Sequence, residues 1–149
     1  MEVQEDFKEL LALLNAHEVE YVIVGAYALS HHGVPRYTGD LDILIRAETE
    51  NARRILDALS EFGFGNLELT LTDFTVPDHV IQLGYPPVRV DLITSITGVS
   101  WEEVAENRET GIYGGIEVFY IGRPQLVKNK RLAGRQKDLA DLEALEESD

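Results

Sequence analysis

Cysteine is absent from the 149 residues of this chain. Its absence excludes disulfide bonds, thiolate metal centres and a cysteine nucleophile. Long apolar runs are absent too, so no segment reaches the length that spans a membrane. The acidic, amphipathic start "MEVQEDFKELLALLNAHEVE" lacks the basic residues and the unbroken apolar stretch of a signal peptide. We therefore expect a cytoplasmic protein with no membrane partner.

Basic residues are scarce, with 13 Lys and Arg against 27 Asp and Glu and a net charge of −14. An evenly acidic surface repels phosphate backbones, which argues against broad nucleic-acid binding. The charge is uneven, however, because residues 123–137, "RPQLVKNKRLAGRQK", hold six basic residues and no acid. This basic window is either a helix face exposed to water or a basic surface that faces a bound anion.

The length and the 44% apolar content predict one domain over residues 1–149, with a frayed tail at 145–149. Apolar periodicity and turn residues then divide the chain into elements. Helices are expected at 3–17, 26–32, 48–64, 100–109 and in a tail after 123 that breaks at Gly134. Strands are expected at 21–25, 40–46, 79–84, 88–95 and 116–121, with a weak strand and loop at 66–74. This order predicts an α/β (α+β) fold with a mixed β-sheet, helices packed against it and a C-terminal helical tail.

Two carboxylates stand at the start of the strand "DLDILIR". Side chains two positions apart on a strand share one face, so Asp40 and Asp42 point together while Leu41, Ile43 and Ile45 pack into the core. Carboxylates held this close repel each other, and a divalent cation such as Mg²⁺ relieves the repulsion. The alternative is a strand edge that presents acids to water.

Two further residues give this pair a context. Asp91 is an acid inside the apolar strand "VRVDLITS", and a neighbouring position in the sheet would complete a cluster of three carboxylates. Gly25 ends a buried strand and begins a helix, whose free N–H groups favour a phosphate. Taken alone, Asp91 could equally be an acid on the surface of a strand. Taken alone, Gly25 could equally belong to a plain turn. The order of glycine turn, helix, D-x-D strand and later strand Asp is the informative feature.

Residues 22–45, "VIVGAYALSHHGVPRYTGDLDILI", resemble the polymerase-beta-like nucleotidyltransferase superfamily. Its signature is an apolar strand, Gly followed by Ser or Gly, then Asp-apolar-Asp and a third acid on a later strand. The sequence is most similar to small single-domain prokaryotic members, including subunits of toxin–antitoxin and abortive-infection systems. The run "HG-x-x-R-x-T-x-D-x-D" of those relatives is matched by His32, Gly33, Arg36, Thr38, Asp40 and Asp42. The closing "NKRLAGRQKDLADLEAL" is similar to their tail.

The resemblance implies that Asp40 and Asp42 bind two Mg²⁺ ions, for which Mn²⁺ can substitute, and that Asp91 binds one. It also implies transfer of a nucleoside monophosphate from an NTP to an acceptor hydroxyl, with Asp91 nearest that hydroxyl. Gly25 and the N–H of Ala26 would cradle the β- and γ-phosphates. Ala26 departs from the signature, and the missing hydroxyl would cost about 1.5–3 kcal/mol of nucleotide binding.

Other side chains near the motif have two interpretations each. Arg36 would reach a phosphate or lie in a surface turn, and Thr38 is expected to stabilise the turn. Lys130 or Lys137 of the basic window would meet the triphosphate if the tail folds over the cleft. His31 and His32 are either metal ligands or packing and capping residues, and we expect the second, since consecutive residues on a helix point apart. Trp101 and Tyr113 are expected to be core or interface aromatics.

The sequence thus supports two functions. One is a metal-dependent nucleotidyltransferase acting on a small molecule, a protein or an RNA end. The alternative is a nucleotidyltransferase-fold subunit that acts through a cognate partner protein or as a homo-oligomer, with little activity alone. A glycosyltransferase is disfavoured by the short chain, and a haloacid-dehalogenase-like phosphatase by the position of the D-x-D after a first strand and a helix. A purely structural role is the weakest candidate.

Overall fold

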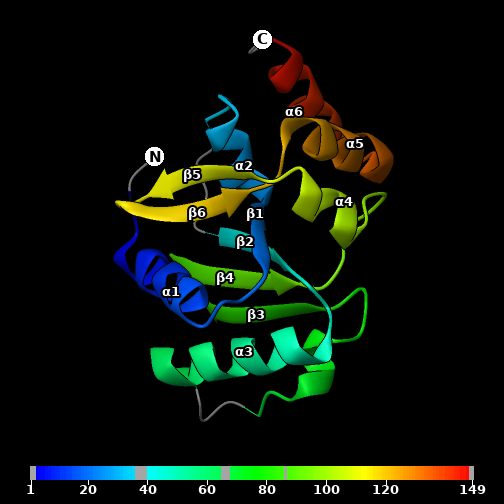
Figure 1. The fold of residues 1–149 in the computed structure, drawn as a ribbon. Helices are drawn as coiled ribbons and strands as arrows, with labels where there is room; N and C mark the ends of the chain where they lie inside the picture. The colour runs from blue at the N-terminus through cyan, green and yellow to red at the C-terminus, as the bar shows by residue number, and fades with distance from the viewer. Residues whose placement is uncertain (1–2, 36–39, 65–67, 86, 148–149) are drawn as a thin grey trace.

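A six-stranded mixed sheet forms the centre of the computed structural model, which describes residues 3–35, 40–64, 68–85 and 87–147 (Figure 1). Its order is β3-β4-β2-β1-β6-β5. The strands are β1 (Tyr21–Val24), β2 (Asp40–Ile45), β3 (Val80–Tyr85), β4 (Val88–Ile93), β5 (Glu109–Tyr113) and β6 (Ile116–Tyr120). The central pairs β2–β4 and β1–β6 are parallel, whereas β1–β2, β3–β4 and β5–β6 are antiparallel. The predicted mixed sheet is confirmed.

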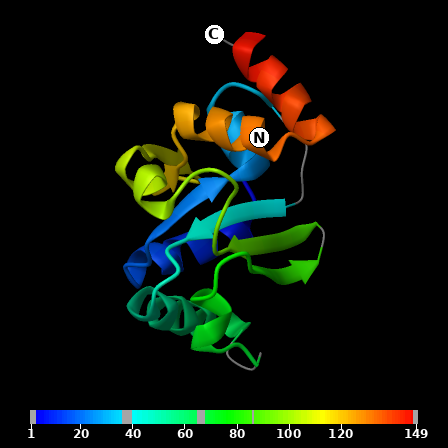
Figure 2. The ribbon, with the colours of Figure 1, turned by 90° about the vertical axis from the view of Figure 1, so that its right-hand side faces the viewer.

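The helices lie around this sheet in two groups (Figures 1 and 2). They are α1 (Glu5–Ala16), α2 (Gly25–His31), α3 (Thr49–Leu59), α4 (Trp101–Glu106), α5 (Arg123–Ala133) and α6 (Gln136–Glu147). Helix α1 buries Phe7, Leu10, Leu11 and Leu14, the residues whose spacing predicted it, and it packs against the sheet and α3. Helices α5 and α6 pack against each other near the end of the sheet where β1 passes into α2 (Figure 1).

At its start, β2 has an apolar face and a polar face, as the alternation of its residues predicts, while Leu44 further along the polar face is buried. Leu41, Ile43 and Ile45 are fully buried in the core. Because successive side chains on a strand point to opposite faces, Asp40 and Asp42 lie on the other face. The packing of the apolar residues therefore fixes the direction in which the two carboxylates point.

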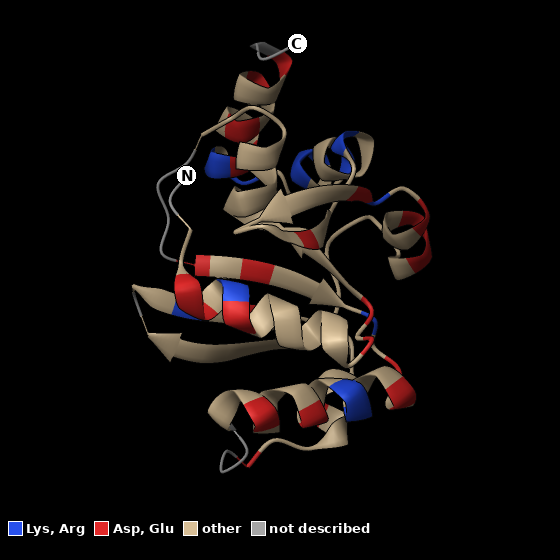
Figure 3. Cartoon of the chain, turned by 60° about the vertical axis from the view of Figure 1, so that its left-hand side comes forward, with Lys and Arg blue, Asp and Glu red and all other residues tan. Residues whose placement is uncertain are grey.

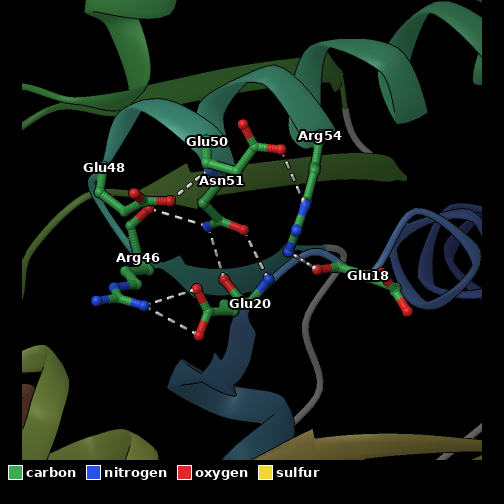
Figure 4. A network of polar contacts seen from close by, with 7 residues as sticks. All are labelled: Glu18, Glu20, Arg46, Glu48, Glu50, Asn51 and Arg54. Atoms are coloured by element: carbon green, nitrogen blue, oxygen red, sulfur yellow. Dashed lines mark hydrogen bonds and ion pairs between the residues drawn. The ribbon is translucent and has the colours of Figure 1, made fainter.

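A buried asparagine ties β1 and β2 to α3 at the end of the strand pair far from Asp42 (Figure 4). The Asn51 side chain is fully buried. Its Nδ2 donates to the carbonyl oxygens of Glu20 (3.0 Å) and Arg46 (2.9 Å), and its Oδ1 accepts from the Glu20 N–H at 2.7 Å. These bonds help to fix the β1–β2 register, in which Val24 stands opposite Asp42.

Two expectations differ from the structure. The helix expected at 100–109 ends at Glu106, and β5, which was not expected, begins at Glu109. The weak strand of 66–74 is wrong for the described part of that segment, where Leu71–Phe74 form a 3₁₀ turn. Helix α6 continues to Glu147, and Leu145 is fully buried. The predicted break at Gly134 is confirmed by its left-handed backbone, φ 66°.

No helix within the described ranges combines the length and the apolarity needed to cross a bilayer.

Candidate active site

The two aspartates of β2 and the aspartate of β4 meet on one face of the sheet. In the parallel β2–β4 register, Asp42 stands beside Asp91 and Asp40 stands beside Arg89. Register neighbours point to the same face, as do residues two apart on a strand. The structure therefore places three carboxylates together, from segments about fifty residues apart in the sequence.

Arg89 is a member of this cluster that the sequence analysis did not identify. Its Nε and Nη2 donate to the two carboxylate oxygens of Asp91, both at 3.0 Å, and its Nε lies 3.9 Å from Asp40 Oδ2. The guanidinium thus supplies positive charge between β2 and β4. The spacing in "VRVDLI" contained the signal, because a residue two before Asp91 must share its face.

The electrostatics of Asp42 reflect this crowding. Burial raises the pKa of Asp42 to about 6, and the charges of Asp91 and Asp40 act in the same direction. Lys137 and Arg89 oppose the rise in pKa. A carboxyl in this position favours a proton or another cation beside it.

Gly25 is the first residue of α2 and lies against Asp42. Its φ of +68° is in the left-handed region, which favours glycine. A Cβ here would overlap Asp42 Oδ2 and would stand 3.0 Å from Asp42 Cβ. The contact between helix start and carboxylate thus depends on the absence of a side chain.

A cavity of about 420 Å³ opens beside these residues. Gly25 and Asp42 line one side of it, and the α5–α6 segment lines the other with Lys130 and Lys137. Ile96 and Leu132 add apolar surface. The basic residues around α5 and the start of α6 lie at this end of the sheet (Figure 3). Residues of the basic window therefore line the same cavity as Asp42. This position agrees with the interpretation in which the window faces an anion.

The two lysines of the cavity differ in their surroundings. Lys130 is buried, and its Nζ lies 3.3 Å from Asp138 Oδ1 and 3.1 Å from Asp141 Oδ2. Burial lowers the pKa of Lys130, and the bond to Asp138 opposes this change. Lys137 is exposed at the start of α6 and acts electrostatically on Asp42. Lys130 therefore joins α5 to α6, whereas Lys137 is available to a ligand.

The remaining predicted residues fall in several places. Arg36 and Thr38 lie outside the described residues. Ala26 is the second residue of α2 and half-buried. Tyr113 is buried, and its hydroxyl accepts from the Gln4 N–H at 2.7 Å, while Trp101 packs half-buried against the core.

The two histidines do not point apart, because His32 lies just past the end of α2. The rings of His31 and His32 meet edge to face with centroids 4.9 Å apart.

Comparison with solved structures identifies the fold. A candidate nucleotidyltransferase from Thermotoga maritima has a TM-score of 0.62 at 16% identity, covering 97% of this chain and 92% of its own. The antibiotic-resistance factor ANT(2'')-Ia gives 0.63 at 10% identity, over 97% and 82%. The lincosamide adenylyltransferase LnuA, with lincomycin bound, gives 0.57 at 13% identity, over 98% of both chains. No protein-family model and no curated protein matches the sequence. The expected nucleotidyltransferase fold is confirmed.

Proposed function

We propose that this chain, built on the nucleotidyltransferase fold, transfers a nucleoside monophosphate from an NTP to an acceptor hydroxyl with the help of divalent metal ions. One observation carries the proposal. The parallel pairing of β2 with β4 gathers Asp40, Asp42 and Asp91 on one face, beside a cavity that Gly25 and Lys137 line. Carboxylates, a glycine-led helix start and a free lysine are the groups that a metal-bound triphosphate needs.

The carboxylate cluster fits Mg²⁺, or Mn²⁺, by the chemistry of its donors. All three side chains offer hard oxygens. Burial, together with the charges of Asp91 and Asp40, raises the pKa of Asp42 to about 6, and a bound cation would favour its ionised form. Asp40 and Asp42 would hold two ions and Asp91 one of them. When bound, the ions would lower the pKa of the acceptor hydroxyl and neutralise charge on the departing pyrophosphate. Each Asp91 oxygen accepts one N–H of Arg89, which leaves a second lone pair on each oxygen for an ion.

The other residues would bind and orient the substrate. Gly25 lets the triphosphate approach the backbone closely, and the N–H of Ala26 would donate to a phosphate oxygen. Lys137 would contact the β- or γ-phosphate from α6. Arg36 remains a candidate phosphate ligand and Thr38 a turn residue. An oxygen of Asp91 would accept the proton of the acceptor hydroxyl.

The acceptor is best sought first among small hydroxylated molecules. Solved structures with this fold include ANT(2'')-Ia with adenylyl-2''-tobramycin and LnuA with lincomycin. Aminoglycosides and lincosamides are therefore the first compounds to test, followed by protein and RNA from cell extract. A partner protein is the second candidate requirement, because Ala26 lacks the signature hydroxyl. Co-expression with neighbouring genes and pull-down tests that requirement.

The decisive experiment offers purified protein, Mg²⁺ and NTP labelled at the α or the γ phosphate to these acceptors. Transfer of α label without γ label supports the proposal, and transfer of γ label alone would instead identify a kinase. Asp42→Asn should abolish transfer, whereas the matched control Asp57→Asn, on the exposed face of α3, should not. Full activity of Asp42→Asn would refute the metal assignment.

A second comparison tests the basic window. Lys137→Ala should raise KM for the NTP roughly tenfold, which corresponds to about 1.4 kcal/mol and is close to the lower end of the value of a charged hydrogen bond, about 1.5–3 kcal/mol. Lys128→Ala is the control, because Lys128 belongs to the same window but pairs with Glu103 at 3.0 Å. Equal effects of the two variants would indicate a general charge effect and no phosphate contact.

A further inference from the structure

We propose that His31, His32 and Glu109 form a second metal site, which takes a transition metal ion such as Zn²⁺. The histidines stand at the end of α2 and Glu109 begins β5. One ligand atom from each of the three lies within 4.8 Å of the others. Glu109 stands between the rings, with Oε1 3.3 Å from His31 Nε2 and Oε2 3.9 Å from His32 Nε2. The three side chains therefore lie close enough together to share one ion.

Packing holds the His31 ring in place before any ion binds. The ring stacks on Tyr120 with centroids 4.2 Å apart and planes inclined by 6°. Gly111 makes room for this stack, because a Cβ there would lie 2.6 Å from Tyr120 Cε2 and 3.2 Å from His31 Cε1. A ligand that is already immobilised loses less conformational entropy when it binds a metal.

His32 has the hydrogen bond that histidine ligands commonly make with their second nitrogen. Its Nε2 lies 2.7 Å from the carbonyl oxygen of Ile121, which accepts a hydrogen bond. While this bond persists, Nε2 carries the proton, so the lone pair that can bind an ion is on Nδ1. The 3.9 Å between Nε2 and Glu109 Oε2 therefore shows only that Glu109 lies beside the His32 ring. The His32 side chain is nearly buried, at 7% exposure, while that of Glu109 is 46% exposed and can move toward an ion.

The donors of His31, His32 and Glu109 favour a different metal ion from the one that the three carboxylates favour. Two imidazoles and one carboxylate suit Zn²⁺ or Co²⁺, which take three protein ligands and a water. His31 also lines a cavity of about 210 Å³ walled by Tyr27, Tyr113 and Tyr120, which leaves room for water near the site. Mg²⁺ prefers oxygen ligands alone, so the carboxylates and the histidines can be loaded separately.

An ion in this site would connect α2 to the β5–β6 hairpin. Helix α2 starts at Gly25, which lies against Asp42, and it ends at His31. Zinc would thus stabilise the helix that borders the candidate active site without entering it. This inference does not depend on the proposed transferase activity.

Cobalt titration of the full chain, free of any histidine tag, tests the site. One Co²⁺ per chain should bind with the visible absorption of four-coordinate cobalt, and Zn²⁺ should displace it. His31→Phe keeps a ring to stack on Tyr120 but loses the ligand nitrogen, and it should weaken Co²⁺ binding at least tenfold. Glu109→Gln should also weaken Co²⁺ binding at least tenfold. Because the Glu109 side chain is exposed, its replacement should leave the core intact.

Two control variants show where the ion binds. His79→Phe removes a histidine that precedes β3, at the opposite edge of the sheet from β5, and should leave the titration unchanged. Asp42→Asn should also leave it unchanged. Unaltered cobalt binding in folded His31→Phe or Glu109→Gln, no visible absorption at all, or loss of binding in Asp42→Asn would each overturn the proposal.

Discussion

Asp42 is the residue at which packing and electrostatics conflict most. It is partly withdrawn from water beside Asp91 and Asp40, and burial is the first cause of its raised pKa. The nearby cations Lys137 and Arg89 only partly compensate. In the metal-free protein at neutral pH, ionised Asp42 therefore costs folding free energy that a bound cation would recover.

This conflict predicts a pH dependence of stability. The folded-state pKa is about 6, above the ordinary value of 3.8, so the folded chain holds the proton while the unfolded chain has released it. The favourable contribution of protonated Asp42 is complete below about pH 4 and is lost as the pH rises through about 6. The free energy of unfolding should fall by up to about 3 kcal/mol across this window, since one pKa unit corresponds to about 1.4 kcal/mol. Urea denaturation of metal-free protein at several pH values measures the change.

Asp42→Asn provides the control for this profile. The neutral amide should flatten the decline between about pH 4 and 6 and should leave the metal-free chain more stable than wild type at pH 8. The same variant should lose the stabilisation that Mg²⁺ and NTP give the wild type. A profile that keeps its slope in Asp42→Asn would assign the titration to another group.

Gly25→Ala should destabilise the chain and disturb the contact between the start of α2 and Asp42. Its positive φ costs alanine about 1–2 kcal/mol, and the new methyl group would overlap Asp42 Oδ2. Gly115→Ala is the matched control, because Gly115 also has a positive φ, 87°, but has open space around its Cα. Thermal melts should show a larger loss for Gly25→Ala, and only this variant should weaken Mg²⁺ binding. Equal losses would mean that the contact with Asp42 is unimportant.

Single residues of the site were predictable to different degrees. The shared face of Asp40 and Asp42 could be predicted because a strand fixes the face of every second residue. The pattern alone left Asp91 open, because its position beside Asp42 depends on the pairing of β4 with β2. Arg89 follows from the same rule, yet its role depends on β4 pairing with β2, which the sequence does not show. The different surroundings of buried Lys130 and exposed Lys137 could not be predicted, because they depend on how α6 packs on α5.

At the level of elements, local patterns predicted most boundaries to within a few residues. The main exception is β5, which was not expected, although its hairpin partner β6 was. The turn between them, Gly114-Gly115, has φ of 59° and 87°, the left-handed conformations that a two-residue hairpin turn requires. The Gly-Gly pair was therefore a usable signal, but the acidic run before it favoured a longer helix. The order of the strands in the sheet, with β1 and β2 at the centre, could not be predicted from local patterns.

The α5–α6 pair should depend on Lys130 for its stability. Lys130→Met would remove the ammonium group that lies 3.3 Å from Asp138 and 3.1 Å from Asp141, whose side chains are exposed by only 1% and 6%. Breaking a buried ion pair costs about 3–5 kcal/mol, so urea denaturation should show a large loss. Lys128→Met, which removes an exposed pair with Glu103, should cost no more than about 1 kcal/mol.

The same variant separates two roles of Lys130. If it binds the triphosphate, as the sequence allowed, Lys130→Met should lose nucleotide affinity while keeping its stability. Loss of stability, together with normal nucleotide affinity in the folded fraction, would instead assign Lys130 to the joint between α5 and α6.

At the scale of the whole molecule, the charge distribution decides which anions reach the site. The chain has a net charge of −14, and its basic window is confined to residues 123–137. Much of that window is occupied within the protein, by Lys130 with Asp138, Lys128 with Glu103 and Arg135 with Asp138. A small Mg²⁺-bound nucleotide meets the remaining charge locally, whereas a long nucleic acid would also meet the acidic surface around it.

We therefore expect no measurable binding of duplex DNA or structured RNA by fluorescence anisotropy, even at about 50 mM salt, where phosphate contacts are strong. An NTP analogue with Mg²⁺ should bind saturably under the same conditions. Arg131→Ala should change neither result, because Arg131 is exposed and does not line the cavity in the described part of the chain. RNA binding that weakens steeply with salt and is reduced by Arg131→Ala would instead make the basic window a nucleic-acid surface. An RNA end would then become the first acceptor to test.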